Sequence, residues 1–174
     1  MPPSNTIFNY GRTLSPVGPV HLLATEDGLA AIYFGTQVDA MDRRFPPEAR
    51  SGFGRNPWLL RAEAFLCCYF AGDLDFLPDI ALDLRGTPFQ RAVWEELQQI
   101  PPAETTNYGD IARRLGRPQA SRAVGAAVGQ NPIAVLVPCH RVVGASGKLT
   151  GYAGGLDVKR FLLDHERLSR MQAA

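Results

Sequence analysis

The segment Ile133–Val143, with the sequence IAVLVPCHRVV, constrains the fold most, because an apolar run stops at a proline and a reactive side chain follows at once. The first five residues are apolar and three of them are β-branched, so they predict a short buried strand. Pro138 ends this strand, because proline has no N–H to donate to a ladder. The predicted strand therefore presents Cys139 beside His140 and Arg141.

The neighbours of Cys139 give its thiol two possible roles. An imidazole and a fixed positive charge favour the thiolate, which is the nucleophilic form of cysteine. A free cysteine, however, is often only a small buried hydrophobic residue. On these residues alone, both interpretations stay open.

Composition excludes several classes of protein. The chain has 174 residues, of which 45% are hydrophobic and 20% charged, which is typical of a globular protein of one moderate domain or two small ones. No apolar run approaches the ~20 residues that span a bilayer, and the first residues lack a secretory signal, so we expect a cytoplasmic protein without a membrane partner. The three cysteines show no zinc-ligand spacing, so we expect no metal and no cofactor.

The first half of the chain predicts a small sheet with a helix. Residues 6–14, 20–25 and 29–34 read as an antiparallel meander, and a polar connection over 37–55 contains a short helix near 38–44. A helix begins at Asn56-Pro57 and ends near Gly72. Residues 73–85 read as an extended crossing segment. We therefore predict an N-terminal α/β domain over 1–85, with net charge −3, and a C-terminal domain over 86–174, with net charge +4.

The second half predicts a helix-turn-helix. Thr87 caps a helix that closes near residue 100, Tyr108–Leu115 forms a short helix, and Gln119–Gly129 forms another after a turn at 116–118. Arg122 is the only charged residue of the last of these helices, whose small side chains allow close approach to a groove. A plain helical hairpin with solvated arginines is the alternative. A final helix is predicted over 156–168, with a frayed tail from residue 169.

Several spaced motifs resemble the O6-alkylguanine-DNA alkyltransferases, also called methylated-DNA–protein-cysteine methyltransferases. The pentad Pro138–Val142 resembles their active-site signature, and the motifs around it follow in the family's order. These are Gly86–Gln90, Tyr108-Gly109, Arg122–Gly125, Asn131-Pro132, Thr150–Gly155 and Leu162–Glu166. The resemblance is dense over residues ~86–168 and looser before them. It implies a mixed α/β (α+β) fold, with a small N-terminal antiparallel sheet plus a helix and a mostly helical C-terminal domain that carries the helix-turn-helix.

The resemblance also implies a reaction and its residues. Cys139 would take a methyl or alkyl group from O6 of guanine, or from O4 of thymine, once per molecule. His140 would act through a water as the base for Cys139, Glu166 would orient His140, and Tyr108 would donate to the departing guanine. The residues implied to contact DNA or the flipped base are Ser121, Arg122, Ala123, Gly125, Asn131, Val142, Tyr152, Ala153 and Gly154. The partner would be double-stranded DNA containing O6-alkylguanine, bound by a protein that is monomeric when free and able to assemble cooperatively on DNA.

Three other functions fit parts of the sequence. An alkyltransferase-like binding protein recognises the lesion without repair, but that class lacks the cysteine that this chain has at position 139. A thiol hydrolase would use the same cysteine–histidine–carboxylate arrangement, but with repeated turnover. A helix-turn-helix transcription factor is disfavoured, because the chain shows no dimer signal and places a buried thiol beside the groove-reading helix.

Overall fold

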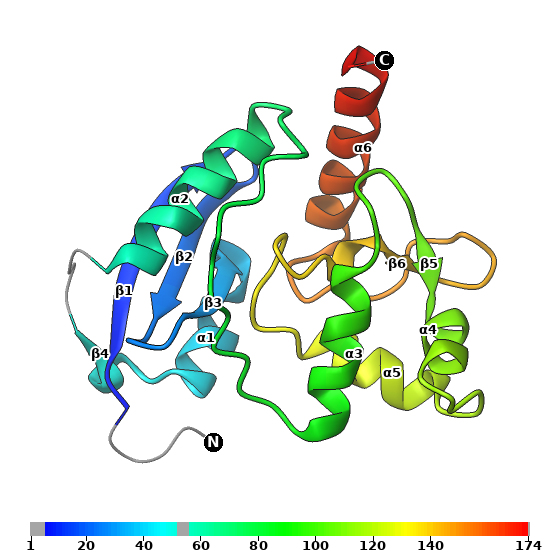
Figure 1. Ribbon diagram of the computed structural model, residues 1–174, viewed down its shortest axis with the longest axis horizontal. Coiled ribbons are helices and arrows are strands. Elements are labelled where there is room, and N and C mark those ends of the chain that lie inside the picture. Colours follow the sequence, from blue (N-terminus) through cyan, green and yellow to red (C-terminus); the bar gives the residue numbers. More distant parts are fainter. Residues whose placement is uncertain (1–5, 52–55, 174) are drawn as a thin grey trace. The chain divides into compact units, whose positions relative to one another are not determined.

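The computed structural model describes residues 6–51 and 56–173, which form two compact units, Met1–Arg85 and Gly86–Ala174 (Figure 1). In the first unit, the strands are β1 (Phe8–Ser15), β2 (Gly18–Ala24), β3 (Leu29–Phe34) and β4 (Arg50–Ser51). They form one sheet in the order β3-β2-β1-β4. The β1–β2 and β2–β3 pairs are antiparallel, whereas β4 lies parallel to β1. The predicted meander is therefore present, with one short parallel strand added.

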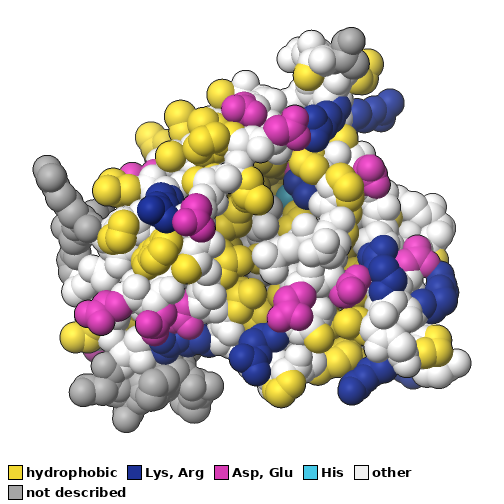
Figure 2. All heavy atoms as spheres, viewed as in Figure 1, with side chains coloured by type: hydrophobic (Ala, Val, Ile, Leu, Met, Phe, Trp, Pro, Cys, Tyr) yellow, Lys and Arg dark blue, Asp and Glu magenta, His cyan; other side chains and the backbone are white. Residues whose placement is uncertain are grey.

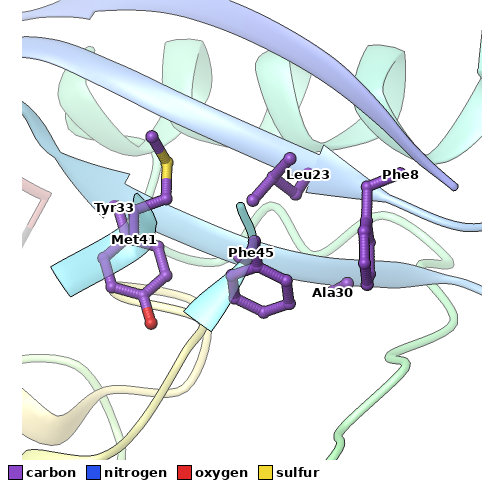
Figure 3. Packing of buried hydrophobic residues seen from close by; sticks show 7 residues of the cluster. Phe8, Leu23, Ala30, Tyr33, Met41 and Phe45 are labelled. Carbon is purple, nitrogen blue, oxygen red and sulfur yellow. The ribbon is translucent and has the colours of Figure 1, made fainter. Parts of the chain in front are cut away.

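Two helices pack on the sheet of the first unit. Side chains alternate between the faces of a strand, so Gly11 faces Leu59 of α2 (Pro57–Phe70) while the neighbouring Tyr10 belongs to the opposite face. That opposite face packs against Met41 of α1 (Val38–Arg44) and against Phe45 (Figure 3). The short 3₁₀ helices Gly35–Gln37 and Pro47–Ala49 flank α1. The end of the predicted 37–55 connection, residues 52–55, lies outside the described residues.

The second unit is mostly helical. Its helices are α3 (Pro88–Gln98), α4 (Tyr108–Arg114), α5 (Ser121–Gly129) and α6 (Leu156–Ala173), with a 3₁₀ helix, η3, at Cys139–Arg141. The two-residue strands β5 (Thr106–Asn107) and β6 (Val142–Val143) pair in parallel. Thr87 accepts a hydrogen bond from the backbone N–H of Gln90 in a complete capping box, and Asn107 caps α4 by accepting from the N–H of Asp110. These caps fix where the helices begin.

Two predictions about this unit are wrong. The segment Ile133–Val137 is not a strand but a series of tight turns, in which the Val137 N–H donates to the carbonyl of Ile133 at 3.0 Å. Val135 adopts a positive φ of 67°, which a β-branched residue rarely does and which a strand cannot contain. The chain after residue 168 is not frayed either, because α6 continues to Ala173 and buries Ser169.

Candidate active site

The turn before Cys139 is held by one side chain, Asn131. Its Oδ1 accepts from the N–H of Ile133 at 3.0 Å, and its Nδ2 donates to the carbonyl of Val137 at 2.7 Å. These two side-chain hydrogen bonds satisfy backbone groups that would otherwise pair with a neighbouring strand. A buried apolar run can therefore fold as turns. Asn131 thereby fixes the backbone that leads directly into Cys139, which is 8% exposed.

The carboxylate of Glu166 is the centre of a buried hydrogen-bond network. Its Oε1 lies 2.8 Å from Nε2 of His140 and 2.8 Å from Nη2 of Arg141, and the Nε of Arg141 lies 3.1 Å from each oxygen. The backbone N–H of Ala103 donates to Oε2 at 2.9 Å. Arg141 also donates to the carbonyl of Ile100 at 2.5 Å. The side chains of His140 and Glu166 are completely buried, so their relative orientation is fixed by this network.

The charges of the network follow from its contacts. Burial alone would raise the pKa of Glu166, but the hydrogen bonds from His140 and Arg141 and the charge of Arg141 outweigh it and hold that pKa well below its usual range. Burial lowers the pKa of His140, although Glu166 acts in the opposite direction. At neutral pH, Glu166 is therefore ionised and His140 is neutral. With Nε2 held by Glu166, Nδ1 of His140 makes no hydrogen bond to any described protein atom and can accept a proton.

The expectation that His140 and Arg141 supply positive charge to the thiol is wrong. Arg141 forms an ion pair with Glu166, and His140 is neutral. Neither side chain therefore has an unpaired positive charge that could stabilise a Cys139 thiolate. Burial raises the pKa of the Cys139 thiol, while hydrogen bonds from Asn131 and Tyr152 and the charge of Lys159 act in the opposite direction. At neutral pH, Cys139 is therefore a protonated thiol and not a thiolate.

Lys159 is the site residue that the sequence did not reveal. Its side chain is fully buried near the start of α6, and its Nζ donates to the carbonyl of Val142 at 2.6 Å and to that of Thr150 at 2.7 Å. A lysine in the first turns of an amphipathic helix normally lies in solvent, and only the packing of the 144–155 loop against α6 buries this one. The signal that could have revealed it is helical spacing, because Lys159 shares one face of α6 with the buried Leu162 and Glu166, whereas Lys148 lies exposed in a turn.

Tyr108 lies at the first position of α4 and is half-buried. Its hydroxyl is 3.2 Å from Oγ1 of Thr150, the residue whose carbonyl accepts from Lys159. Its ring lies beside Gly125 of α5, where an added Cβ would be 3.7 Å from Cδ1. The structure thus connects Tyr108 to the loop that also carries Tyr152, which opposes the rise in the pKa of the Cys139 thiol. The groups that act on the Cys139 thiol thus come from Asn131, from the loop with Tyr152 and from Lys159 of α6.

The other expected contact residues fall into two groups. Ser121, Arg122 and Ala123 are exposed at the start of α5, whereas Gly125 faces Tyr108 and is half-buried. Near the thiol, Val142 and Gly154 are buried, Tyr152 is half-buried and Ala153 is exposed. The first group combines small side chains with one arginine on α5. The second group lies on the η3–β6 segment and the following loop.

The arginines around α4 and α5 differ in whether their guanidinium groups already contact other residues. Arg113 pairs with Asp110, Arg114 pairs with Glu96 at 3.0 Å, and Arg117 lies over the ring of Phe89. Arg122 has no hydrogen bond or ion pair with any other residue that the structure describes. Figure 2 shows basic and acidic side chains side by side over α4. The guanidinium that is free to bind an external group is therefore that of Arg122, on the exposed face of α5.

Neither a metal cluster nor a membrane span is found within residues 6–51 and 56–173. No group of three or more histidine, cysteine, aspartate or glutamate side chains in these ranges is placed to hold a metal ion. None of the helices there combines the length and the apolar character needed to cross a bilayer.

Comparisons with known proteins agree on one family. Residues 88–168 match the family model of the DNA-binding domain of 6-O-methylguanine DNA methyltransferase. The chain is 49% identical over 162 residues to a methylated-DNA–protein-cysteine methyltransferase of Mycolicibacterium paratuberculosis, covering 92% of this chain and 93% of the relative. A protein of the same name from Methanosarcina acetivorans is 48% identical, with 90% and 97% covered. The crystal structure of Mycobacterium tuberculosis OGT in complex with DNA superposes with a TM-score of 0.80 at 43% identity, covering 92% of this chain and 94% of that one.

Proposed function

The chain belongs to the family of methylated-DNA–protein-cysteine methyltransferases, and on this premise we propose that it repairs double-stranded DNA by moving one alkyl group from O6 of guanine to Cys139. The observation that carries the proposal is the arrangement of the buried thiol, the neighbouring neutral His140 and the ionised Glu166 that holds its Nε2 at 2.8 Å. This is a nucleophile, a base and a group that orients the base.

The proposed step is a direct displacement. The bond between Sγ of Cys139 and the alkyl carbon forms as the bond between that carbon and O6 breaks, and the electron pair of the broken bond stays on the guanine. The thiol proton passes through a water to Nδ1 of His140. Tyr108 donates its hydroxyl proton to the departing guanine and regains one from solvent as His140 releases its own. The products are an unmodified guanine and a thioether at Cys139.

Positioning should contribute more to the rate than the ionisation of the thiol. Full ionisation would raise the thiolate fraction at neutral pH by roughly thirtyfold, but nucleophilicity falls with pKa by a similar factor. The raised pKa of Cys139 is consistent with this balance, because the thiol stays protonated until His140 accepts its proton. An in-line approach of the sulfur and stabilisation of charge on the leaving guanine should therefore lower the barrier more than thiol ionisation does.

The DNA would be bound through α5, with the target base outside the stack. Extruding a base costs a few kcal/mol, and less for a poorly paired alkylguanine. Arg122 would fill the gap, and the exposed Ser121 and Ala123 allow close approach to the minor groove, where little sequence can be read. The same pocket would accept O4-alkylthymine. We place this activity in the cytoplasm, in a protein that is monomeric when free and able to assemble cooperatively on DNA.

The test is intact-protein mass spectrometry after incubation with a DNA duplex that contains O6-methylguanine. We expect a gain of one methylene mass on the peptide that holds Cys139, once per molecule, and no gain in Cys139→Ser. Cys67 and Cys68 serve as internal controls, because their peptide should stay unmodified. Repeated turnover without a modified protein would indicate a hydrolase instead, and lesion binding without transfer would indicate a binding protein.

A further inference from the structure

Lys159 carries a buried positive charge that the proposed reaction does not yet use. Its side chain has no exposed surface, and its Nζ donates to two carbonyls, those of Val142 and Thr150. Within the described residues, no carboxylate oxygen lies within 4.0 Å of this nitrogen, since none of the ion pairs found there includes it. A buried cation without a counter-charge is costly. The two carbonyls offset part of this cost in the resting protein, and a group that becomes negative beside Lys159 would offset the rest.

The ionisable groups around Lys159 leave one candidate for that compensation. Lys159 is hydrogen-bonded to Val142 at the end of η3. The ionisable groups of η3, of its partners and of the following loop are Cys139, His140, Arg141, Glu166 and Tyr152. Arg141 and Glu166 neutralise each other in an ion pair at 2.8 Å. Neutral His140 is hydrogen-bonded to the same carboxylate, and Tyr152 opposes the rise in the pKa of the Cys139 thiol. The group that can become negative next to Lys159 is therefore Cys139.

We propose that Lys159 is a positioning residue whose ammonium is the counter-charge of the Cys139 thiolate, held in place by the carbonyls of Val142 and Thr150. Val142 follows Cys139 by three residues, so the ammonium is fixed to the same short segment as the thiol. The bond to Thr150 fixes it to the loop that reaches Tyr108 and Tyr152. The role of this charge in alkyl transfer rests on the proposed function, whereas its effect on the thiol does not.

The ammonium of Lys159 explains how a buried, protonated thiol can still react. When His140 takes the thiol proton, a negative charge appears in a buried pocket, where an uncompensated charge is unfavourable. Lys159 stabilises that charge without moving, because both of its carbonyl contacts are already formed. The mutual effect is visible in both groups: Lys159 opposes the rise in the pKa of Cys139, and Cys139 opposes the fall in the pKa of Lys159 that burial causes.

The first test measures thiol ionisation without DNA. Wild type, Lys159→Met, Lys159→Gln and Lys148→Met are treated with iodoacetamide across a pH series, and modification is read on the peptide that holds Cys139. Met removes both the charge and the donors, Gln keeps donors without the charge, and Lys148 is exposed and is the only other lysine of the chain. We expect the pH midpoint to rise by about one unit in both Lys159 variants, which is about tenfold slower modification below the midpoint. Lys148→Met should match the wild type.

Two results of this test would overturn the proposal. If Lys159→Gln behaves as the wild type while Lys159→Met does not, the residue acts through hydrogen bonds and not through charge. If both variants keep the wild-type midpoint, Lys159 has no effect on the thiolate. Thermal unfolding of each variant shows which of them are folded and can be compared.

A second measurement needs no change at Lys159. With only two lysines, ¹⁵N-lysine labelling gives two Nζ signals, and Lys148→Met assigns them. We expect Cys139→Ser to lower the pH at which the Lys159 amine titrates, because the thiolate that favours its charged form is gone. An unchanged titration would overturn the proposal even if the Lys159 variants do not fold. If the thiol midpoint moves but no methyl is taken from DNA, the counter-charge stands and the proposed repair function fails.

Discussion

Tyr108 is half-buried, and its hydroxyl is 3.2 Å from that of Thr150, whose loop also carries Tyr152 beside the Cys139 thiol. A phenol can stabilise a leaving group by donating a hydrogen bond or a proton as charge develops. Its ring packs beside Gly125 through carbon atoms, so removing the hydroxyl leaves that packing in place. The hydroxyl of Tyr108 can therefore be tested for a chemical role without disturbing the packing of its ring.

The variant Tyr108→Phe should slow alkyl transfer by roughly tenfold or more while DNA affinity stays near that of the wild type, because only the leaving-group donor is lost. Single-turnover transfer from an O6-methylguanine duplex gives the rate, and fluorescence anisotropy gives the affinity. Thr150→Val is the matched control, since it removes the partner of the Tyr108 hydroxyl but keeps the donor. Equal transfer rates in Tyr108→Phe and the wild type would contradict the role of the phenol.

For single residues, the sequence predicted that His140 and Glu166 lie together, but not the electrostatics around Cys139. His140 and Glu166 do meet beside the Cys139 segment, as the motif resemblance implied. Arg141, expected to activate the thiol by adjacency, instead turns to Glu166. Lys159, whose charge opposes the rise in the pKa of the thiol, lies far along the chain in α6. Adjacency along the chain does not say which way a side chain points, and burial of a single lysine depends on packing between distant segments.

The helices were more predictable than the turns between them. Thr87 and Asn107 are local capping signals that act within one helical turn, so the starts of α3 and α4 could be read from the sequence. The run Ile133–Val137 has strand composition, yet the side chain of Asn131 holds it as turns. The two-residue pair β5–β6 depends on contacts between segments that are distant along the chain, which no local pattern encodes.

The turn between α4 and α5 should depend on the backbone conformation of Gly116. Gly116 has a positive φ of 69°, and a Cβ added there would meet nothing within 4 Å, so replacement is opposed by backbone conformation alone. Gly129 at the end of α5 also has open space, but its φ is not positive. We expect Gly116→Ala to lower the free energy of unfolding by about 1 kcal/mol and Gly129→Ala to leave it equal or raise it by a few tenths.

Urea unfolding can follow this change through a fluorescent probe in the second unit. The chain has one tryptophan in each unit, Trp58 in α2 and Trp94 in α3. In a Trp58→Phe background, fluorescence reports Trp94, which is buried and donates to the carbonyl of Ala127 in α5. A loss of stability in both glycine variants, or in neither, would show that the turn is not held by the conformation of Gly116.

At the scale of the whole molecule, the chemistry and the groups that would bind DNA all lie in the unit Gly86–Ala174, which has net charge +4. The unit Met1–Arg85 has its own core, formed around Phe8, Tyr33 and Phe45 (Figure 3). Each unit has hydrophobic residues enough to bury a core of its own. The pH dependence of the second unit should therefore be set by its own buried groups, chiefly His140 and Glu166.

The stability of the second unit should fall in two steps as pH decreases. The pKa of His140 is lowered from 6.5, so the unfolded state binds a proton below about pH 6.5 that the folded state does not, and stability is lost from there downward. The pKa of Glu166 is lowered from 4.5, so its contribution is present above about pH 4.5 and is lost as pH falls towards the folded value. Urea unfolding of Trp58→Phe between about pH 2 and 7.5, read from Trp94, measures both steps.

The variant His140→Gln separates these steps, because it removes the group that titrates first. We expect the loss of stability between about pH 6.5 and 5 to become smaller in this variant, while the steeper loss at lower pH remains because Glu166 still pairs with Arg141. His21→Gln is the control: its pKa is also lowered by burial, but it lies in the first unit, whereas Trp94 lies in the second. A wild-type curve that is flat from pH 7 to 5, or that His140→Gln leaves unchanged, would show that the imidazole is not held neutral by burial.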